Sequence, residues 1–238
     1  RVILTGPPFR HALYALELKK ISNVELILDC RDLWWDTKHI PPISRKRQEF
    51  EIHAEEEVVC GVDKILSISD FQKSILTTRY PNHAPVFVLR NGFDKDDIPR
   101  DIKPKRATPA EIRFVHLGVM HADKRYYWIP FVKALAMLKA KNPVLFDKLV
   151  FDFVGICPDE VAEEFQRVGA RINLLGFVDL GQSYHYLNQA DIVLWFKYDS
   201  APGDFATKFG DYISLKKYMW VFSLKGDVTE HVEQNGIG

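Results

Sequence analysis

The sequence has few cysteines and no long apolar run. Only three of its 238 residues are cysteine, at Cys30, Cys60 and Cys157, and their wide spacing fits neither a CxxC pair nor a disulfide framework. This favours a reducing compartment, so we expect a cytoplasmic protein. No apolar stretch approaches the roughly 18 residues that span a bilayer. Contact with the inner face of a membrane is the alternative location.

Neither sign of charge is in excess. The chain has 32 basic and 32 acidic residues, for a formal net charge of +0. Proteins that hold nucleic acid by its backbone carry a strong positive balance, so we expect no nucleic-acid partner. The eight histidines show no HxxxH or HExxH spacing, and GxSxG and GxxxxGK[ST] are missing. A metal site, a common hydrolase and a P-loop enzyme are therefore unsupported.

Short apolar runs alternate with amphipathic stretches along nearly the whole chain. The alternation predicts strands at 1–6, 24–29, 63–69, 86–92, 112–118, 148–155, 172–178, 191–197 and 219–224. Helical patterns fill most of the intervals between them. Apolar strands separated by helices indicate parallel sheets covered on both faces. The predicted class is α/β.

The composition changes near the middle of the chain. "FDKDDIPRDIKPKRATPAE" (93–111) holds three prolines, many charges and few large apolar residues, which predicts a linker. We expect an N-terminal Rossmann-like domain at 1–95, a linker at 96–111 and a C-terminal Rossmann-like domain at 112–238. The chain opens on a strand pattern and closes on a helix and a turn. We therefore expect an internal piece in which both domains are incomplete.

Doubly wound sheets bind ligands at the carboxyl ends of their strands, so the loops after strands hold the candidate sites. In "GVMHADKR", Gly118 permits a sharp turn, and Lys124 or Arg125 comes near the start of the next helix. A helix start beside a lysine is a natural phosphate site. An ordinary surface lysine is the alternative there.

The second candidate is the helix start in "DFATKFGDY" (204–212). We expect Thr207 to cap this helix and the amides from Phe205 to Lys208 to point at an anion. Lys208 would neutralise phosphate. Asp211, on the same helix face, would accept hydrogen bonds from sugar hydroxyls. The alternative is a flexible loop followed by a solvated ion pair.

The third candidate is "LDCRDLWWD" (28–36). Charges after a central strand are costly to bury unless they are paired or face a cleft. Arg31 and Asp32 are therefore either a structural pair or functional residues. Trp34 and Trp35 either pack or form a platform for a sugar or lipid acceptor. "ISRKRQEFE" (43–51) is a mildly basic helix start, for which a solvated face is the simplest interpretation.

Taken in order, seven segments resemble the retaining glycosyltransferases of the GT-B fold, in the glycosyltransferase-4-like group. They are "LILDCRDLWW", "VDKILSISDFQKSIL", "VFVLRNGFD", "RFVHLGVMHADKR", "LVFDFVG", "INLLGFVDLGQSYHYLNQADIVLWF" and "TKFGDYISLKKYMWVFS". Members of that group show an NG-aromatic-D turn, G-x5-K, GFV, ADI-apolar and K-x-x-E-Y. Each motif is degenerate alone, but their shared order covers almost the whole chain.

The resemblance implies transfer of a sugar from a UDP- or GDP-sugar to a glycan or lipid-linked acceptor. It implies retention at the anomeric carbon, no metal or other cofactor, and a place in polysaccharide or glycolipid biosynthesis. Lys124 would contact the diphosphate and Asp211 the ribose. The amides around Phe205, Ala206, Thr207 and Lys208 would cradle phosphate beside Gly118, and the base would lie near Gly176, Phe177 and Val178.

Two departures from the family pattern bear on catalysis. The family's two glutamates, eight positions apart, fall on Gly203 and Asp211, so one is absent and one is shortened. The N-terminal-domain histidine falls on Arg31, followed by Asp32. We take Arg31, Asp32 and Asp211 as the catalytic candidates. A non-catalytic sugar-nucleotide or glycan-binding module and a sugar-nucleotide epimerase are the alternatives, and the oligomeric state is left open.

Overall fold

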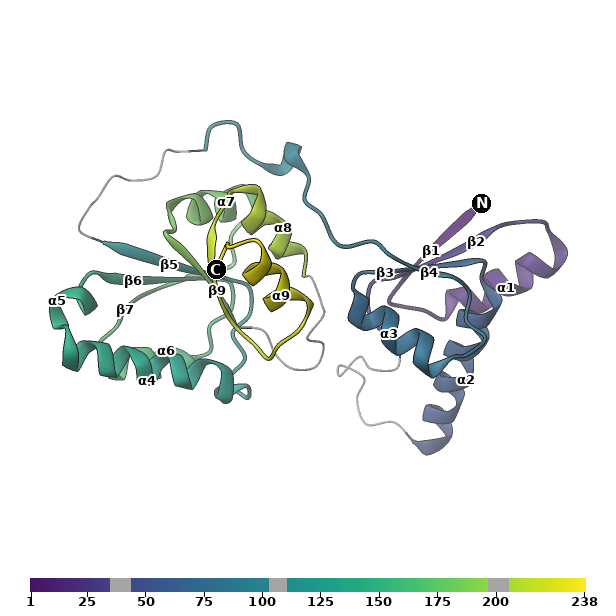
Figure 1. Cartoon of the computed structure of the whole chain (residues 1–238), viewed down its shortest axis with the longest axis horizontal. Coiled ribbons are helices and arrows are strands. Elements are labelled where there is room, and N and C mark those ends of the chain that lie inside the picture. Colours follow the sequence, from purple (N-terminus) through teal and green to yellow (C-terminus); the bar gives the residue numbers. More distant parts are fainter. Residues whose placement is uncertain (35–43, 103–110, 197–205) are drawn as a thin grey trace. The chain divides into compact units, whose positions relative to one another are not determined.

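A computed structural model describes residues 1–34, 44–102, 111–196 and 206–238. They form two compact units, each with one parallel β-sheet (Figure 1). Unit 1 comprises Arg1–Asn91, and unit 2 comprises the described residues from Gly92 onward. Of the expected linker, residues 103–110 lie outside the described part. None of the described helices is long and apolar enough to cross a membrane.

Unit 1 has four parallel strands in sequential order. The strands are β1 (Val2–Gly6), β2 (Leu26–Cys30), β3 (Lys64–Ser67) and β4 (Val86–Val88); the helices between them are α1 (His11–Ile21), α2 (Arg45–Gly61) and α3 (Asp70–Arg79). Because successive crossovers share one hand, all three helices pack on one face (Figure 1). Leu4, Leu28 and Ile65 are buried in the core of this face. Ile3 and Phe87 are 63% and 51% exposed. The described sheet of unit 1 is therefore covered on one face only, whereas the sequence pattern predicts cover on both faces.

Serine side chains begin two of these helices. Ser44 accepts a hydrogen bond from the Arg47 amide at the start of α2, and Ser69 accepts one from the Gln72 amide at the start of α3. Each satisfies an amide that has no acceptor within its helix. The Ser44 cap places the start of α2 at Arg45, within the helix start that the sequence indicates at 43–51.

Unit 2 has five parallel strands in the order β7-β6-β5-β8-β9. The strands are β5 (Ile112–Leu117), β6 (Leu149–Val154), β7 (Arg171–Gly176), β8 (Ile192–Phe196) and β9 (Tyr218–Phe222). The helices are α4 (Arg125–Lys141), α5 (Pro143–Phe146), α6 (Asp159–Arg167), α7 (Leu180–Gln189), α8 (Thr207–Ser214) and α9 (Asp227–Gln234), with a 3-10 turn η1 (Lys95–Asp97). Figure 1 shows α4 and α6 on one face of the sheet and α7 and α8 on the other. This is a doubly wound sheet.

Aromatic side chains hold the α4–α6 face together. Phe151 and Phe153 of β6 pack edge-on against Phe165 of α6, with ring centroids 5.9 and 5.2 Å apart. Phe131 of α4 approaches Phe151 at 5.8 Å. All six residues of β6 are buried, as its apolar run, interrupted only by Asp152, predicts for a central parallel strand.

Candidate functional site

The chain reverses its direction across the unit 2 sheet between β5 and β8. From β5 it proceeds outward to β6 and β7, and from β8 it proceeds the other way to β9. The carboxyl ends of the two strands at such a reversal form the crevice in which doubly wound proteins bind ligands. Gly118 directly follows β5, and α8 follows β8 after residues 197–205, which lie outside the described residues.

Lys208 of α8 reaches the end of β5. Its Nζ donates to the Leu117 carbonyl at 2.9 Å and lies 5.8 Å from the Trp195 ring centroid. A Cβ placed on Gly118 would come within 3.3 Å of this ammonium, and Gly118 has a φ of +106°. Glycine there avoids backbone strain and keeps the ammonium uncrowded. The sequence-predicted residues Gly118 and Lys208 are thus adjacent at the reversal point.

The ends of three neighbouring strands are joined through glycine backbones. Gly155, after β6, has a φ of +123°, and a Cβ there would overlap the Gly118 carbonyl. Its amide donates to the Gly176 carbonyl, at the end of β7, at 2.7 Å. Gly155 was missed by the sequence analysis. Its signal is a glycine directly after a buried strand, in "FDFVG".

His116 lies directly beneath this edge, and the sequence analysis did not select it. The residue is 2% exposed, and its Nδ1 is 3.1 Å from the Leu194 carbonyl oxygen. Burial, and then the positive charge of Lys208, lower the pKa of His116 to about 3. The imidazole is therefore neutral at physiological pH and leaves Lys208 as the charged group there.

Asp211 is held by a tyrosine of the preceding helix. The Tyr184 hydroxyl donates to Asp211 Oδ1 at 2.7 Å, and Tyr184 is 1% exposed. Burial and this bond raise the pKa of Tyr184, so it remains a donor. Asp211 and Lys208 are each engaged with a buried part of unit 2, which disfavours the solvated-pair alternative.

The start of α8 differs from its predicted form. Ala206 is the residue before the helix and Thr207 is its first residue, with no side-chain cap. The prediction that Thr207 caps α8 is therefore wrong. The amides of Thr207 and Lys208 belong to the first turn, where helix amides lack an intrahelical acceptor. Phe205 lies outside the described residues.

The other donor-side candidates follow β5 and β7. Lys124 precedes α4, and its ammonium pairs with Asp123 at 2.8 Å, which raises the pKa of the lysine. Phe177, directly after Gly176, is 78% exposed, and Val178 is half-buried. Phe177 thus presents an aromatic face at the carboxyl edge.

In unit 1, Arg31 pairs with Asp29. Its Nε donates to Asp29 Oδ2 at 3.0 Å, and its Nη1 donates to Asn91 Oδ1 at 2.6 Å. Of the two interpretations of Arg31 and Asp32, the structure does not support a mutual pair: the contact that it gives for Asp32 is a backbone one, from Cys30 Sγ to the Asp32 carbonyl. Arg31 is thereby oriented by two side chains that the sequence analysis did not single out.

Trp34 packs inside unit 1. It is 6% exposed and stacks on Phe9 with ring centroids 5.3 Å apart. Of the two interpretations of this tryptophan, the structure supports packing over a platform for an acceptor. Trp35 lies outside the described residues.

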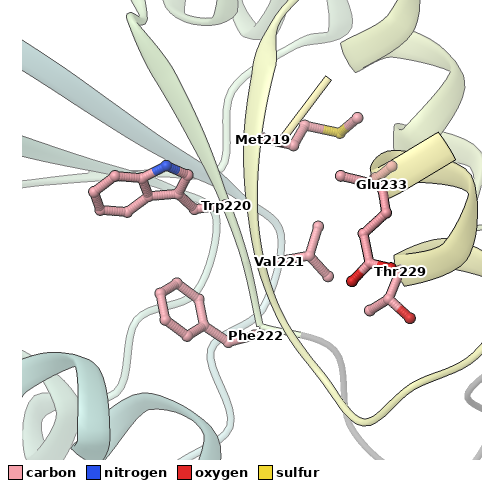
Figure 2. A pocket seen from close by; sticks show the side chains of 8 residues that line it. Met219, Trp220, Val221, Phe222, Thr229 and Glu233 are labelled. Atoms are coloured by element: carbon pink, nitrogen blue, oxygen red, sulfur yellow. The ribbon is translucent and has the colours of Figure 1, made fainter. Parts of the chain in front are cut away.

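Two further observations concern a metal site and a pocket away from this edge. Among the described residues, no three His, Cys, Asp or Glu side chains are grouped so as to hold a metal ion. A pocket of about 340 Å³ lies between β9 and α9 (Figure 2). Its lining is Met219, Trp220, Val221, Phe222, Thr229, Val232, Glu233 and Gly238. With Glu233 as its one charged residue, this lining does not suit phosphate.

Comparison with known proteins locates the fold. No family model and no curated protein matches the sequence. Sucrose-phosphate synthase from Thermosynechococcus elongatus matches at 15% identity and a TM-score of 0.58, covering 93% of this chain and 55% of that chain. An E. coli trehalose-6-phosphate structure bound with UDP-2-fluoro glucose matches at 10% identity and a TM-score of 0.65, covering 97% and 60%.

A third match has a different activity. A Listeria monocytogenes protein described as a UDP-N-acetylglucosamine 2-epimerase matches at 12% identity and a TM-score of 0.56, covering 98% of this chain and 59% of that chain. The chain therefore spans little more than half the length of these proteins. Such identities show the fold alone. The predicted α/β architecture of two Rossmann-like parallel-sheet domains is confirmed.

Proposed function

We propose that the chain is part of a retaining glycosyltransferase of the glycosyltransferase-4-like group. It transfers a sugar from a UDP- or GDP-sugar to a hydroxyl of a glycan or lipid-linked acceptor. The observation that carries the proposal is the Lys208 ammonium, held at the end of β5 with Asp211 on the same helix. A cation and a carboxylate at the reversal point of a doubly wound sheet suit a diphosphate and a ribose.

The donor site stabilises the departing diphosphate by fixed charge. Lys208, the first amides of α8 and Lys124 supply positive potential where the leaving group gains negative charge. Such preorganised groups act without reorganising during the reaction. This arrangement needs no metal ion. Asp211, oriented by Tyr184, accepts the ribose hydroxyls, and Phe177 offers its ring to the base, beside Gly176 and Val178.

The reaction exchanges one carbon–oxygen bond for another. The bond from the anomeric carbon to the diphosphate breaks, and a bond to the acceptor oxygen forms on the same face of the sugar. The acceptor proton leaves with the diphosphate. Arg31, which is oriented by Asp29 and Asn91, and its neighbour Asp32 are the catalytic candidates of unit 1. A cytoplasmic location fits the nucleotide donor.

Two alternatives use the same fold. The epimerase match has a TM-score close to that of the sucrose-phosphate synthase match, and an epimerase would convert the donor without an acceptor. A non-catalytic binding module would bind the nucleotide and leave its sugar unchanged. The first glutamate of the family pattern is absent, because its position falls on Gly203, and this absence favours the module.

Calorimetric titration with UDP, GDP, UDP-glucose and GDP-mannose tests the donor site. Lys208→Met keeps the apolar stem over Trp195, and Asp211→Asn can still accept from Tyr184. Each variant is expected to bind the preferred nucleotide with an affinity lower by about tenfold or more, because each substitution removes a charge-assisted contact. Lys225→Ala, an exposed lysine paired weakly with Glu230 at 3.9 Å, is the control and should bind normally.

The outcomes separate the three functions. Sugar transfer to an added acceptor supports the transferase. A changed sugar nucleotide with no acceptor present identifies an epimerase, and binding without turnover identifies the module. A folded chain that binds none of the four compounds contradicts the donor site itself.

A further inference from the structure

Two arginines of unit 1 meet at a single carboxylate. Glu51 of α2 is 5% exposed. Its Oε1 accepts from Arg10 Nη2 and from Arg47 Nε, the latter at 2.8 Å. Arg10 follows the loop after β1, whereas Arg47 lies one helical turn before Glu51. Both guanidinium groups are therefore drawn together at one oxygen atom.

The carboxylate at the centre of this cluster is fixed from its other side. Trp34 Nε1 donates to Glu51 Oε2 at 2.9 Å. Trp34 also stacks on Phe9, the residue before Arg10, with the two rings 12° from parallel. Phe9 and Trp34 are both nearly fully buried. The loops after β1 and β2 and the helix α2 thus hold the two guanidinium groups in place before any ligand arrives.

The cluster has an excess of positive charge. Two guanidinium groups share one carboxylate, so their mutual repulsion is offset only in part. The side chains of Arg10 and Arg47 are 52% and 40% exposed, so the guanidinium groups reach solvent while Glu51 stays buried. Each of the two groups has further N–H donors beyond the one that binds Glu51.

We propose that Arg10 and Arg47 form a binding site for a phosphate group, with Glu51 as the positioning residue. Planar guanidinium groups match phosphate oxygens with paired hydrogen bonds, and a phosphate bridging both arginines relieves their repulsion. We assign this phosphate group to the acceptor substrate, and this assignment rests on the proposed function. Phosphate binding itself does not, because the site lies wholly in unit 1.

Titration with inorganic phosphate, followed by phosphorus NMR, tests the site. Arg10→Gln and Arg47→Gln are each expected to weaken phosphate binding about tenfold, the loss of one charge-assisted hydrogen bond. Arg45→Gln is the matched control. Arg45 is on the same helix and contacts Glu49 in the same i,i+4 arrangement, at 3.0 Å, and its loss should leave binding unchanged.

Lysine variants keep the test valid if a glutamine variant unfolds. Arg10→Lys and Arg47→Lys retain the charge that Glu51 requires but lose the planar fork, so they should fold and still bind phosphate several-fold more weakly. Equal phosphate binding by wild type and folded Arg10 and Arg47 variants overturns the proposal. So does an equal loss in Arg45→Gln, or no binding to folded wild type at millimolar phosphate.

Vesicles distinguish the two sources of such a phosphate. Binding to phosphatidylglycerol vesicles but not to phosphatidylcholine vesicles, lost in Arg47→Gln and kept in Arg45→Gln, supports the site with a lipid headgroup as its source. Phosphate binding without vesicle binding supports it with a free phosphate ester. Arg47→Gln should bind nucleotide with the affinity of wild type. Nucleotide titration therefore tests the donor site, and phosphate titration tests the Arg10–Arg47 site independently of it.

Discussion

At the scale of single residues, His116 shows how burial in the core makes the pKa of a titratable group depend on folding. It lies between the rings of Phe153 and Phe196, whose centroids are 6.2 and 5.8 Å from its own. In this desolvated site, a second positive charge beside Lys208 is energetically unfavourable. The folded protein therefore keeps the imidazole neutral where the unfolded chain would protonate it.

His116 should make the fold sensitive to acid. Its pKa is about 3 in the folded protein and about 6.5 in an unfolded chain, so only the unfolded state takes up this proton between those values. The free energy of unfolding should therefore fall as pH drops below about 6.5, by up to about 1.4 kcal/mol per pH unit.

Urea unfolding of wild type and His116→Gln between pH 7 and 4 measures this contribution. The variant is expected to be less stable at pH 7 and to lose much of the decline toward acid. A variant whose stability declines with pH as steeply as that of wild type would rule out His116 as its source.

Residue pairs show what sequence could and could not predict at the candidate site. Lys208 and Asp211 were identified because their spacing is local. Their partners, Leu117 and Tyr184, are 91 and 27 residues away, and no local pattern carries such contacts. The alternative in which Arg31 and Asp32 pair with each other is not supported by the structure, for a geometric reason. Neighbouring side chains at a strand end point to opposite faces, whereas Asp29 and Arg31, two residues apart, share one.

At the scale of elements, the strands were predictable and their ends were not. Apolar runs identified all nine strands of the described residues, because strands of parallel sheets are rich in apolar residues. The predicted strand 86–92 ends at Val88. Beyond Val88, the Arg90 side chain donates a hydrogen bond to Asp70, and the Asn91 side chain accepts one from Arg31. Such side-chain contacts depend on tertiary structure and leave no periodicity to read.

Helix α8 depends on a glycine for its position. A Cβ on Gly210 would lie 2.7 Å from the Gly92 carbonyl oxygen and 3.2 Å from Phe93 Cβ. Gly210→Ala should therefore destabilise the protein by about 1–3 kcal/mol, as overpacking does, despite the better helix propensity of alanine. Because Asp211 is the next residue, nucleotide binding should weaken as well.

Chemical unfolding and nucleotide titration of this variant provide the measurement. Gly92→Ala is the matched control, because a Cβ on Gly92 meets nothing within 4 Å. If Gly210→Ala were as stable as wild type and bound nucleotide equally well, the close contact would have no structural importance.

At the scale of the whole molecule, the two units are expected to respond separately to their ligands. Nucleotide should slow hydrogen exchange at 118–124 and 206–211 in unit 2 and leave α1 and α3 of unit 1 unchanged. At a ligand concentration about 100 times Kd, exchange through global opening of the binding unit should slow about 100-fold.

Hydrogen exchange resolved by peptide is the measurement for this prediction. Phosphate should give the reverse pattern, with protection in α2 and the loop after β1. Nucleotide protection confined to unit 1 would contradict the donor-site assignment, even if calorimetry detects binding.

The one-sided sheet of unit 1 determines which substitutions its strands tolerate. Along β1, Leu4 is buried against the helices, whereas Ile3 is largely exposed on the other face. A polar substitution at Leu4 would disrupt core packing and destabilise the fold. The same substitution at Ile3 would leave the new side chain exposed to water in the described unit. Tolerance to mutation should therefore alternate from one residue to the next, so the strands of unit 1 can accumulate sequence changes on one face while their fold is kept by the other.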